Sequence, residues 1–125
     1  MFRTALVLVA AVAVGALLLS TAAFGRSAAS HKLRGTVGPS YTISLTQSGK
    51  KVKKLKAGTY TFVISDKASI HQFTVEQEKG GKFEKALTSV PFVGTKTVKV
   101  KLKKGQWKYY CKPHESLMHG FFKVT

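Results

Sequence analysis

The sequence predicts an all-β domain, built as a β-sandwich or a small barrel. Segment 94–105, GTKTVKVKLKKG, alternates between apolar residues and lysines, as a half-buried strand does. Its apolar positions are Val98, Val100 and Leu102. Short runs rich in β-branched and aromatic residues recur along the chain, and turn residues separate them. After the first 25 residues, no segment shows the helical period of apolar residues.

The first 25 residues have the composition of an export signal. Arg3 precedes an uncharged apolar run at 5–19, and small residues follow that run up to Ala23. Because the run is shorter than the ~20 residues that cross a bilayer, we expect residues 1–25 to be removed and the mature protein to be exported. The periplasm, the extracellular space and the cell surface all fit this expectation. A retained membrane anchor is the alternative.

One folded domain is predicted at 40–125, and residues 26–39, which contain Ser, Ala and Gly, are predicted to link it to the signal. We expect irregular chain at 83–92, where Pro91 argues against a central strand. Runs of strand composition predict strands at 41–47, 59–65, 70–76, 94–105, 106–111 and 120–125.

The chain is strongly basic, with 21 Lys and Arg against five Asp and Glu and a formal net charge of +16. Arg3 is the only charged residue among the first 25, so the mature part retains +15. Such a field attracts an acidic protein or the anionic surface of a membrane or wall. Nucleic acid is not expected, since the lysine-rich segment 50–56 has no aromatic residue to stack on bases. That segment predicts a solvated turn or an edge strand, where lysines discourage pairing.

Cys111 is the only cysteine of the chain, which excludes an internal disulfide and a lipid attached at an N-terminal cysteine. In an oxidising compartment a free thiol invites oxidation unless something occupies it. The lone cysteine is therefore a first indication that a metal is bound at this position.

The stretch YYCKPHESLMHG, residues 109–120, places Cys111, His114 and Met118 within eight residues. Two imidazoles, a thiolate and a weak thioether are the ligand set of blue-copper sites. His71 is the candidate for the second imidazole, because it shares strand parity with the apolar residues that follow it and so points to their face.

Each of these residues has a more ordinary interpretation when it is taken alone. A single inward histidine or methionine is most often part of the core, and a single buried cysteine behaves as a small hydrophobe. Zinc accepts the thiolate and the imidazoles, but a thioether is a poor zinc ligand. A Cys–His nucleophilic pair lacks a nearby Asn or Asp to orient it and a recognisable oxyanion loop, so we do not expect an enzyme. Copper uses all four residues.

The stretch YYCKPHESLMHGFFKV resembles the C-terminal ligand loop of the cupredoxins, the plastocyanin and azurin group of blue-copper proteins. KAGTYTFVISDKASIHQFTV resembles the segment that carries their first histidine ligand, and GTKTVKVKLKKGQWKYYC resembles their penultimate strand pair. The resemblance covers residues 41–125. It implies an antiparallel Greek-key β-sandwich with one copper ion in a type 1 site, and the implied ligands are His71, Cys111, His114 and Met118.

The resemblance also implies a function, a one-electron carrier between redox partners, working as a monomer. The strong positive charge makes an acidic redox protein the expected partner. A copper carrier or buffer for an exported enzyme is the alternative, and a metal-free basic module is a third possibility.

Two departures from the family pattern concern the ligand segments. Gln72 stands where plastocyanin-like members often have an asparagine that ties the two segments together, which puts that bond in doubt. The spacing from His114 to Met118 is one residue shorter than in plastocyanins, so that counting from His114 would select His119 as the axial ligand. Alignment on the MHG pattern selects Met118 instead. Adjacent residues entering a strand point to opposite sides, and we therefore expect only Met118 to face the copper.

Overall fold

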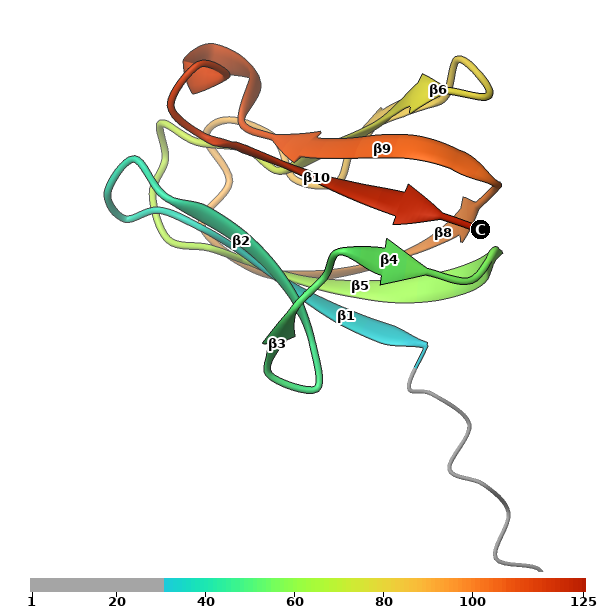
Figure 1. Ribbon diagram of the computed structural model, residues 1–125. Coiled ribbons are helices and arrows are strands. Elements are labelled where there is room, and N and C mark those ends of the chain that lie inside the picture. Colours follow the sequence, from blue (N-terminus) through green and yellow to red (C-terminus); the bar gives the residue numbers. More distant parts are fainter. Residues whose placement is uncertain (1–30) are drawn as a thin grey trace, which may run out of the picture.

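The structure, a computed structural model that describes residues 31–125, is a sandwich of two five-stranded sheets (Figure 1). The strands of sheet A are β1 (Lys32–Val37), β2 (Ile43–Gln47), β3 (Lys50–Lys51), β5 (Gly58–Asp66) and β8 (Gly94–Leu102). Those of sheet B are β4 (Lys54–Leu55), β6 (Thr74–Lys79), β7 (Glu84–Ala86), β9 (Gly105–Tyr110) and β10 (His119–Val124). The predicted signal at 1–25 and the first part of the predicted linker, 26–30, lie outside the described residues.

The strand order is β3-β2-β1-β5-β8 in sheet A and β4-β10-β9-β6-β7 in sheet B. This architecture confirms the predicted all-β sandwich. The pairing is mostly antiparallel, but β1 pairs with β5 and β10 pairs with β4 in parallel. In both parallel pairs the two strands are distant in the sequence. The chain between them returns to the end of the sandwich where the first strand began, so the second strand runs in the same direction as the first.

The prediction of a linker at 26–39 is wrong over β1, which forms the middle strand of sheet A. Leu33, Gly35 and Val37 point inward from β1 and are buried. A Cβ atom on Gly35 would lie 2.5 Å from Cδ1 of Ile64 and 2.8 Å from the ring of Phe73. The glycine that suggested a loop in the sequence is therefore needed for close packing of the strand against the core.

The core lies between the two sheets. The side chains of Phe62, Trp107 and Phe122 are at most 2% exposed and come from both layers. On β8, Val100 and Leu102 are buried while Lys99 and Lys101 are exposed, as the alternation predicts. Among residues 31–125, no helix is long and apolar enough to cross a membrane.

Three further predictions concern edge strands and the residue at which a strand begins. The lysine-rich segment 50–56 forms β3 and β4, each at the edge of a sheet, which confirms the prediction of a turn or edge strand. The predicted strand at 70–76 is wrong for its first half, because β6 begins only at Thr74. The prediction of irregular chain at 83–92 is wrong over β7, a short edge strand that pairs with β6. A strand of three residues is too short to show the alternation of apolar and polar residues that predicts a strand.

Candidate metal centre

The structure brings His71, Cys111 and His114 together at one end of the sandwich. Nδ1 of His71 lies 3.1 Å from Nδ1 of His114. The Cys111 Sγ atom lies 3.8 Å from Nδ1 of His71 and 3.7 Å from Nδ1 of His114. His71 and Cys111 are fully buried, and His114 is half-buried. The ligand atoms of these three side chains all lie within 4.8 Å of one another, close enough to bind one metal ion together.

Pairing of β6 with β9 places the two ligand segments side by side. Thr74, the first residue of β6, is opposite Tyr110, the last residue of β9. Cys111 follows directly after β9, and His71 precedes β6 by a short irregular segment. The sequence predicted that His71 points inward with Phe73, and both side chains are fully buried, although His71 itself is not in a strand.

The loop that carries the other ligands is closed by its own backbone. The Cys111 N–H donates to the Met118 carbonyl at 3.0 Å, and the Met118 N–H donates to the His114 carbonyl at 2.9 Å. The His114 N–H donates to the Cys111 carbonyl at 3.1 Å, where the short 3-10 helix η1 (Lys112–His114) begins. Pro113 lies in its first turn, where the missing N–H costs nothing. The spacing within this segment is therefore held without help from distant parts of the chain.

Met118 and His119 face opposite sides, as the sequence predicts. The Met118 side chain is fully buried and belongs to the core cluster, while His119 is exposed. The ring of His119 is turned outward, and its Nδ1–H donates to the Glu115 carbonyl at 2.7 Å. Of these two neighbours, only Met118 is on the inner side of the sandwich with Cys111.

The three donor atoms have the separations of ligands around one ion. Metal bonds of about 2.0 Å to imidazole nitrogen and about 2.3 Å to thiolate sulfur, at trigonal angles, separate nitrogen from nitrogen by about 3.5 Å and nitrogen from sulfur by about 3.7 Å. The observed edges are 3.1, 3.7 and 3.8 Å. Nε2 of His71 is buried and makes no hydrogen bond, so Nδ1 is the nitrogen of this ring that faces other donors. The residues present thus fit a trigonal N₂S site.

Asp66, at the end of β5, supports the turn that carries His71. Its carboxylate accepts a hydrogen bond from the Ala68 N–H at 3.3 Å, and the Ala68 carbonyl accepts one from the His71 N–H at 3.3 Å. Burial raises the pKa of Asp66 above its ordinary value, while hydrogen bonds from Ala68 and Thr88 and the nearby His71 act in the opposite direction. Thr88 also accepts a hydrogen bond from the Phe73 N–H at 2.9 Å. Both sides of the His71 segment are therefore connected to a buried polar group.

Gln72 does not tie the two ligand segments together. Its side-chain oxygen accepts a hydrogen bond from the Thr74 hydroxyl, within the same segment. The ladder between β6 and β9 connects the two segments instead. On the same sheet, the Tyr110 hydroxyl donates to Glu84 of β7 at 2.6 Å, which links β9 to β7 across β6. Burial and this carboxylate raise the pKa of Tyr110.

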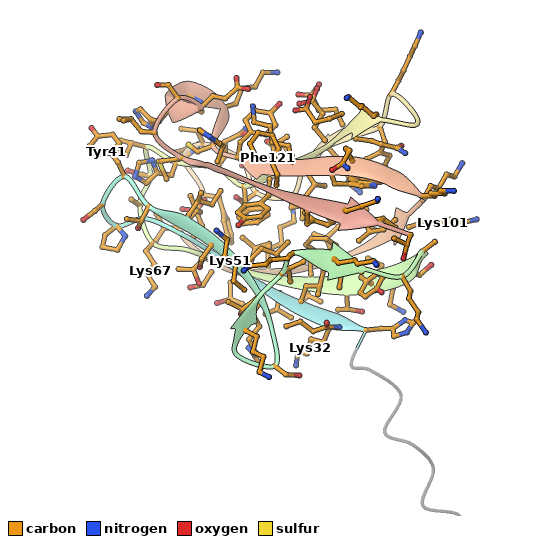
Figure 2. The ribbon with its side chains drawn as sticks, in the orientation of Figure 1. Lys32, Tyr41, Lys51, Lys67, Lys101 and Phe121 are labelled. Carbon is orange, nitrogen blue, oxygen red and sulfur yellow. The ribbon has the colours of Figure 1, made fainter. Side chains whose placement is uncertain are left out.

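Tyr41 is a member of the site that the sequence did not indicate. Its ring meets the ring of His114 edge-on, at 4.9 Å and 86° between the planes, and the ring of His71 at 5.5 Å and 73°. The side chain is 53% exposed and reaches the site from the connection between β1 and β2 (Figure 2). No local pattern could reveal this contact, because it depends on where sheet A places that connection.

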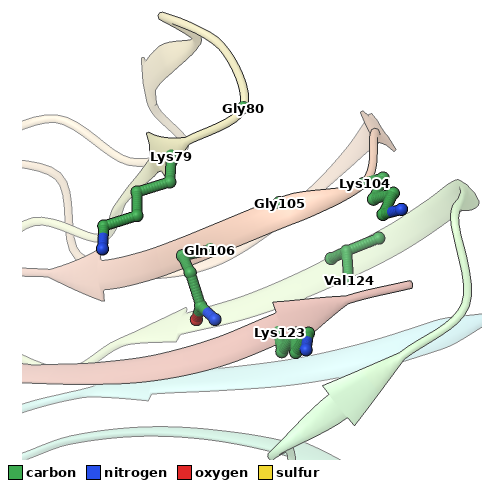
Figure 3. Close-up of a pocket in the computed structure, with 7 residues that line it drawn as sticks. All are labelled: Lys79, Gly80, Lys104, Gly105, Gln106, Lys123 and Val124. Atoms are coloured by element: carbon green, nitrogen blue, oxygen red, sulfur yellow. The ribbon is translucent and has the colours of Figure 1, made fainter.

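A surface pocket of about 290 Å³ lies at the opposite end of the strands (Figure 3). Gly105 and Gln106 at the start of β9 and Val124 at the end of β10 line it, together with three lysines. It contains no cysteine, histidine or carboxylate. The chemistry of the ligand end is therefore not repeated there.

Comparison with known proteins gives a likeness of fold. No protein-family model and no curated protein matches the sequence. The solved structure of the copper protein rusticyanin matches with a TM-score of 0.56 and 14% identity, over 75% of this chain and 76% of that chain. Reduced rusticyanin matches at 0.55 and 14% identity, over 75% and 78% of the two chains. The structure of reduced rusticyanin determined by NMR matches with a TM-score of 0.51 and 16% identity, over 75% of this chain and 76% of that chain.

At these identities the likeness concerns the arrangement of the strands. Rusticyanin is a cupredoxin, and the resemblance seen in the sequence pointed to the same group. The observed order of strands and the position of the His-Cys-His cluster at one end of the sandwich agree with a cupredoxin arrangement. The chain therefore has the cupredoxin fold.

Proposed function

We propose that this chain is a type 1 copper protein that carries one electron at a time between redox partners. The observation that carries the proposal is the triangle of two imidazole nitrogens and one thiol sulfur, with edges of 3.1, 3.7 and 3.8 Å. The buried thioether of Met118 lies at the same end of the core. When it is bound, copper supplies the one-electron couple.

The proposed ligand set accommodates both oxidation states. The Cys111 thiolate and the Met118 thioether are soft donors that suit Cu(I), whereas the imidazoles of His71 and His114 also suit Cu(II). Because the ligands are positioned by a closed loop and by the end of a sheet, little rearrangement accompanies a change of charge. A rigid, buried site of this kind keeps the barrier to electron transfer low.

His114 is the proposed exit for the electron. It is half-buried, whereas the other two members of the triangle are fully buried. Apolar groups surround it on the surface: Leu117 is 68% exposed, Tyr41 is 53% exposed, and Pro113 is also exposed. A partner that contacts this surface would approach the imidazole directly. We propose an acidic redox protein as that partner, since the net charge attracts anionic surfaces over long distances.

Two further parts of the proposal rest on the sequence. Residues 1–25 are proposed to direct export and to be removed, so that the protein works outside the cytoplasm. We propose a carrier and not an enzyme, because the paired Cys111 and His114 face a second imidazole and have no orienting carboxamide or carboxylate among their hydrogen-bond partners. The burial of His71 and Cys111 favours a retained ion over copper delivery. Facile transfer of the ion to a chelator would favour delivery instead.

The decisive experiment adds Cu(II) to the purified protein and records visible and paramagnetic-resonance spectra. Charge transfer from the thiolate should give an intense visible band, because the Cu–S bond is strongly covalent. Cys111→Ser should remove the band and keep the circular dichroism of the β-sandwich, since serine has nearly the same size. His31→Ala, at an exposed histidine outside the cluster, should keep the band and controls for adventitious copper. A coloured Cys111→Ser protein would exclude the proposed site.

A further inference from the structure

The outer face of sheet A carries basic charge and no acidic charge. Strand register assigns its members, because residues paired across neighbouring strands share a face. One row runs from Lys51 through Thr46, Arg34 and Val63 to Thr97. The next rows contain Lys32, Thr61 and Lys99, then Thr59 and Lys101, and on the other side Ser44, Thr36, Ser65 and Thr95. We call these residues the basic face.

All five acidic residues of the chain lie elsewhere. Asp66 is on β5 but points inward and is 1% exposed. Glu76, Glu78 and Glu84 belong to the paired strands β6 and β7 of sheet B, and Glu115 follows η1. The ion pairs of Glu115 with Lys108 and of Glu84 with Lys112 are therefore on the sheet B side. The exposed acidic residues are therefore confined to the sheet B side, whereas lysines occur on both sides of the sandwich.

The basic residues of this face are spread in two dimensions. Lys51 is on the edge strand β3, Lys32 and Arg34 are on the central strand β1, and Lys99 and Lys101 are on the opposite edge strand β8. With strands about 4.8 Å apart and alternate residues about 6.7 Å apart, the face measures roughly 20 Å by 20 Å. Figure 2 labels Lys32, Lys51 and Lys101 at separated points of this layer.

We propose that the basic face docks the protein on the surface of an anionic lipid bilayer. A bilayer presents phosphate groups in two dimensions, as this face presents cations, whereas a linear polyanion follows a line or a groove. Hydroxyl groups of Thr and Ser stand between the cations and donate hydrogen bonds to phosphate oxygens. The face contains no aromatic side chain for the stacking of nucleobases.

The geometry leaves the proposed copper site accessible in the docked state. The ligands are at one end of the strands, where Tyr41 and Leu117 are exposed, and not on the outer face of sheet A. The inference does not depend on the proposed electron transfer, because no residue of the basic face belongs to the metal cluster.

The test measures how the purified chain partitions onto vesicles of phosphatidylcholine and onto vesicles that also contain phosphatidylglycerol. The readout is the ratio of the two partition coefficients, which cancels any contribution of apolar insertion. At ~1 kcal/mol for each cation near an anionic surface, the double substitution Lys99→Gln and Lys101→Gln should lower this ratio roughly thirtyfold. Raising the salt from 0.1 M to 1 M, which shortens the Debye length from about 10 Å to about 3 Å, should abolish the preference.

The matched control is the double substitution Lys54→Gln and Lys123→Gln, two exposed lysines paired on sheet B. It removes the same charge from the other side of the sandwich, about 10 Å further away, so the ratio should fall only about three- to fourfold. Equal losses in both variants would show that net charge and not the basic face decides binding. Wild-type protein that binds heparin but shows no preference for anionic vesicles would overturn the membrane assignment. The copper band, recorded for every variant, should stay unchanged.

Discussion

Gly38 allows a sharp test of how the position of His71 is controlled. The residue has a φ of +75°, and a Cβ atom there would lie 2.9 Å from Cδ2 of His71 and 3.3 Å from the Cβ of Ala68. A contact below 3.0 Å forces one of the two groups to shift, and we expect the imidazole to move in a Gly38→Ala variant. Gly49 has a similar φ of +78° but nothing within 4 Å of the added atom. Comparing Gly38→Ala with Gly49→Ala therefore separates the free energy lost to backbone strain from the free energy lost to the contact with His71.

The magnitudes follow from these two terms. An L-residue in the left-handed region costs ~1–2 kcal/mol, which both variants share. Forcing an extra carbon into a packed site costs a further ~1–3 kcal/mol, which only Gly38→Ala incurs. We expect Gly49→Ala to destabilise the protein by about 1 kcal/mol and Gly38→Ala by about 3 kcal/mol. Because the ring of His71 is displaced, only Gly38→Ala should change the copper spectrum.

Urea unfolding of the metal-free variants measures the free energies, and visible and paramagnetic-resonance spectra of the Cu(II) forms report the ligand geometry. Equal destabilisation in the two variants would show that the contact with His71 does not matter. A Gly38→Ala protein with the wild-type spectrum would refute the argument that this glycine makes room for the ligand. So would a Gly49→Ala protein with an altered spectrum, since Gly49 is remote from the cluster.

Two further predictions concern the proposed axial ligand Met118, compared with its neighbour His119, and Tyr110, which precedes Cys111. Met118→Leu should keep the copper and raise the reduction potential, because losing a sulfur donor destabilises Cu(II) more than Cu(I), while His119→Ala should leave spectrum and potential nearly unchanged. If voltammetry shows the larger shift for His119→Ala, the axial assignment is wrong. Tyr110→Phe removes the hydrogen bond to Glu84 and should cost about 1 kcal/mol at neutral pH. The raised pKa of Tyr110 means that the folded state keeps the phenol proton above pH 10.0, where the unfolded chain releases it, so wild-type stability falls as pH rises beyond that value. Tyr110→Phe should lose less stability over that range, and an identical alkaline decline in urea titrations would contradict this role.

The sequence alone determined the features that depend on short spacings. Cys111, His114 and Met118 are close in the chain, and the loop between them is closed by its own backbone hydrogen bonds, so their grouping could be predicted locally. Alignment on the MHG pattern selected Met118, and the alternation of neighbouring residues at the start of β10 excluded His119 from the same side. The lysine pattern of β8 likewise predicted a strand with one buried side.

Only the tertiary structure decided the features that depend on pairing between distant segments. β1 was hidden because Gly35, which suggested a loop, is the residue that lets Ile64 and Phe73 approach the strand. Tyr41 reaches the two imidazoles only because sheet A carries the connection before β2 to the ligand end. The net charge was visible in the sequence, but the absence of exposed carboxylates from one face was not, since the register of the five strands determines which side chains share the outer face of sheet A.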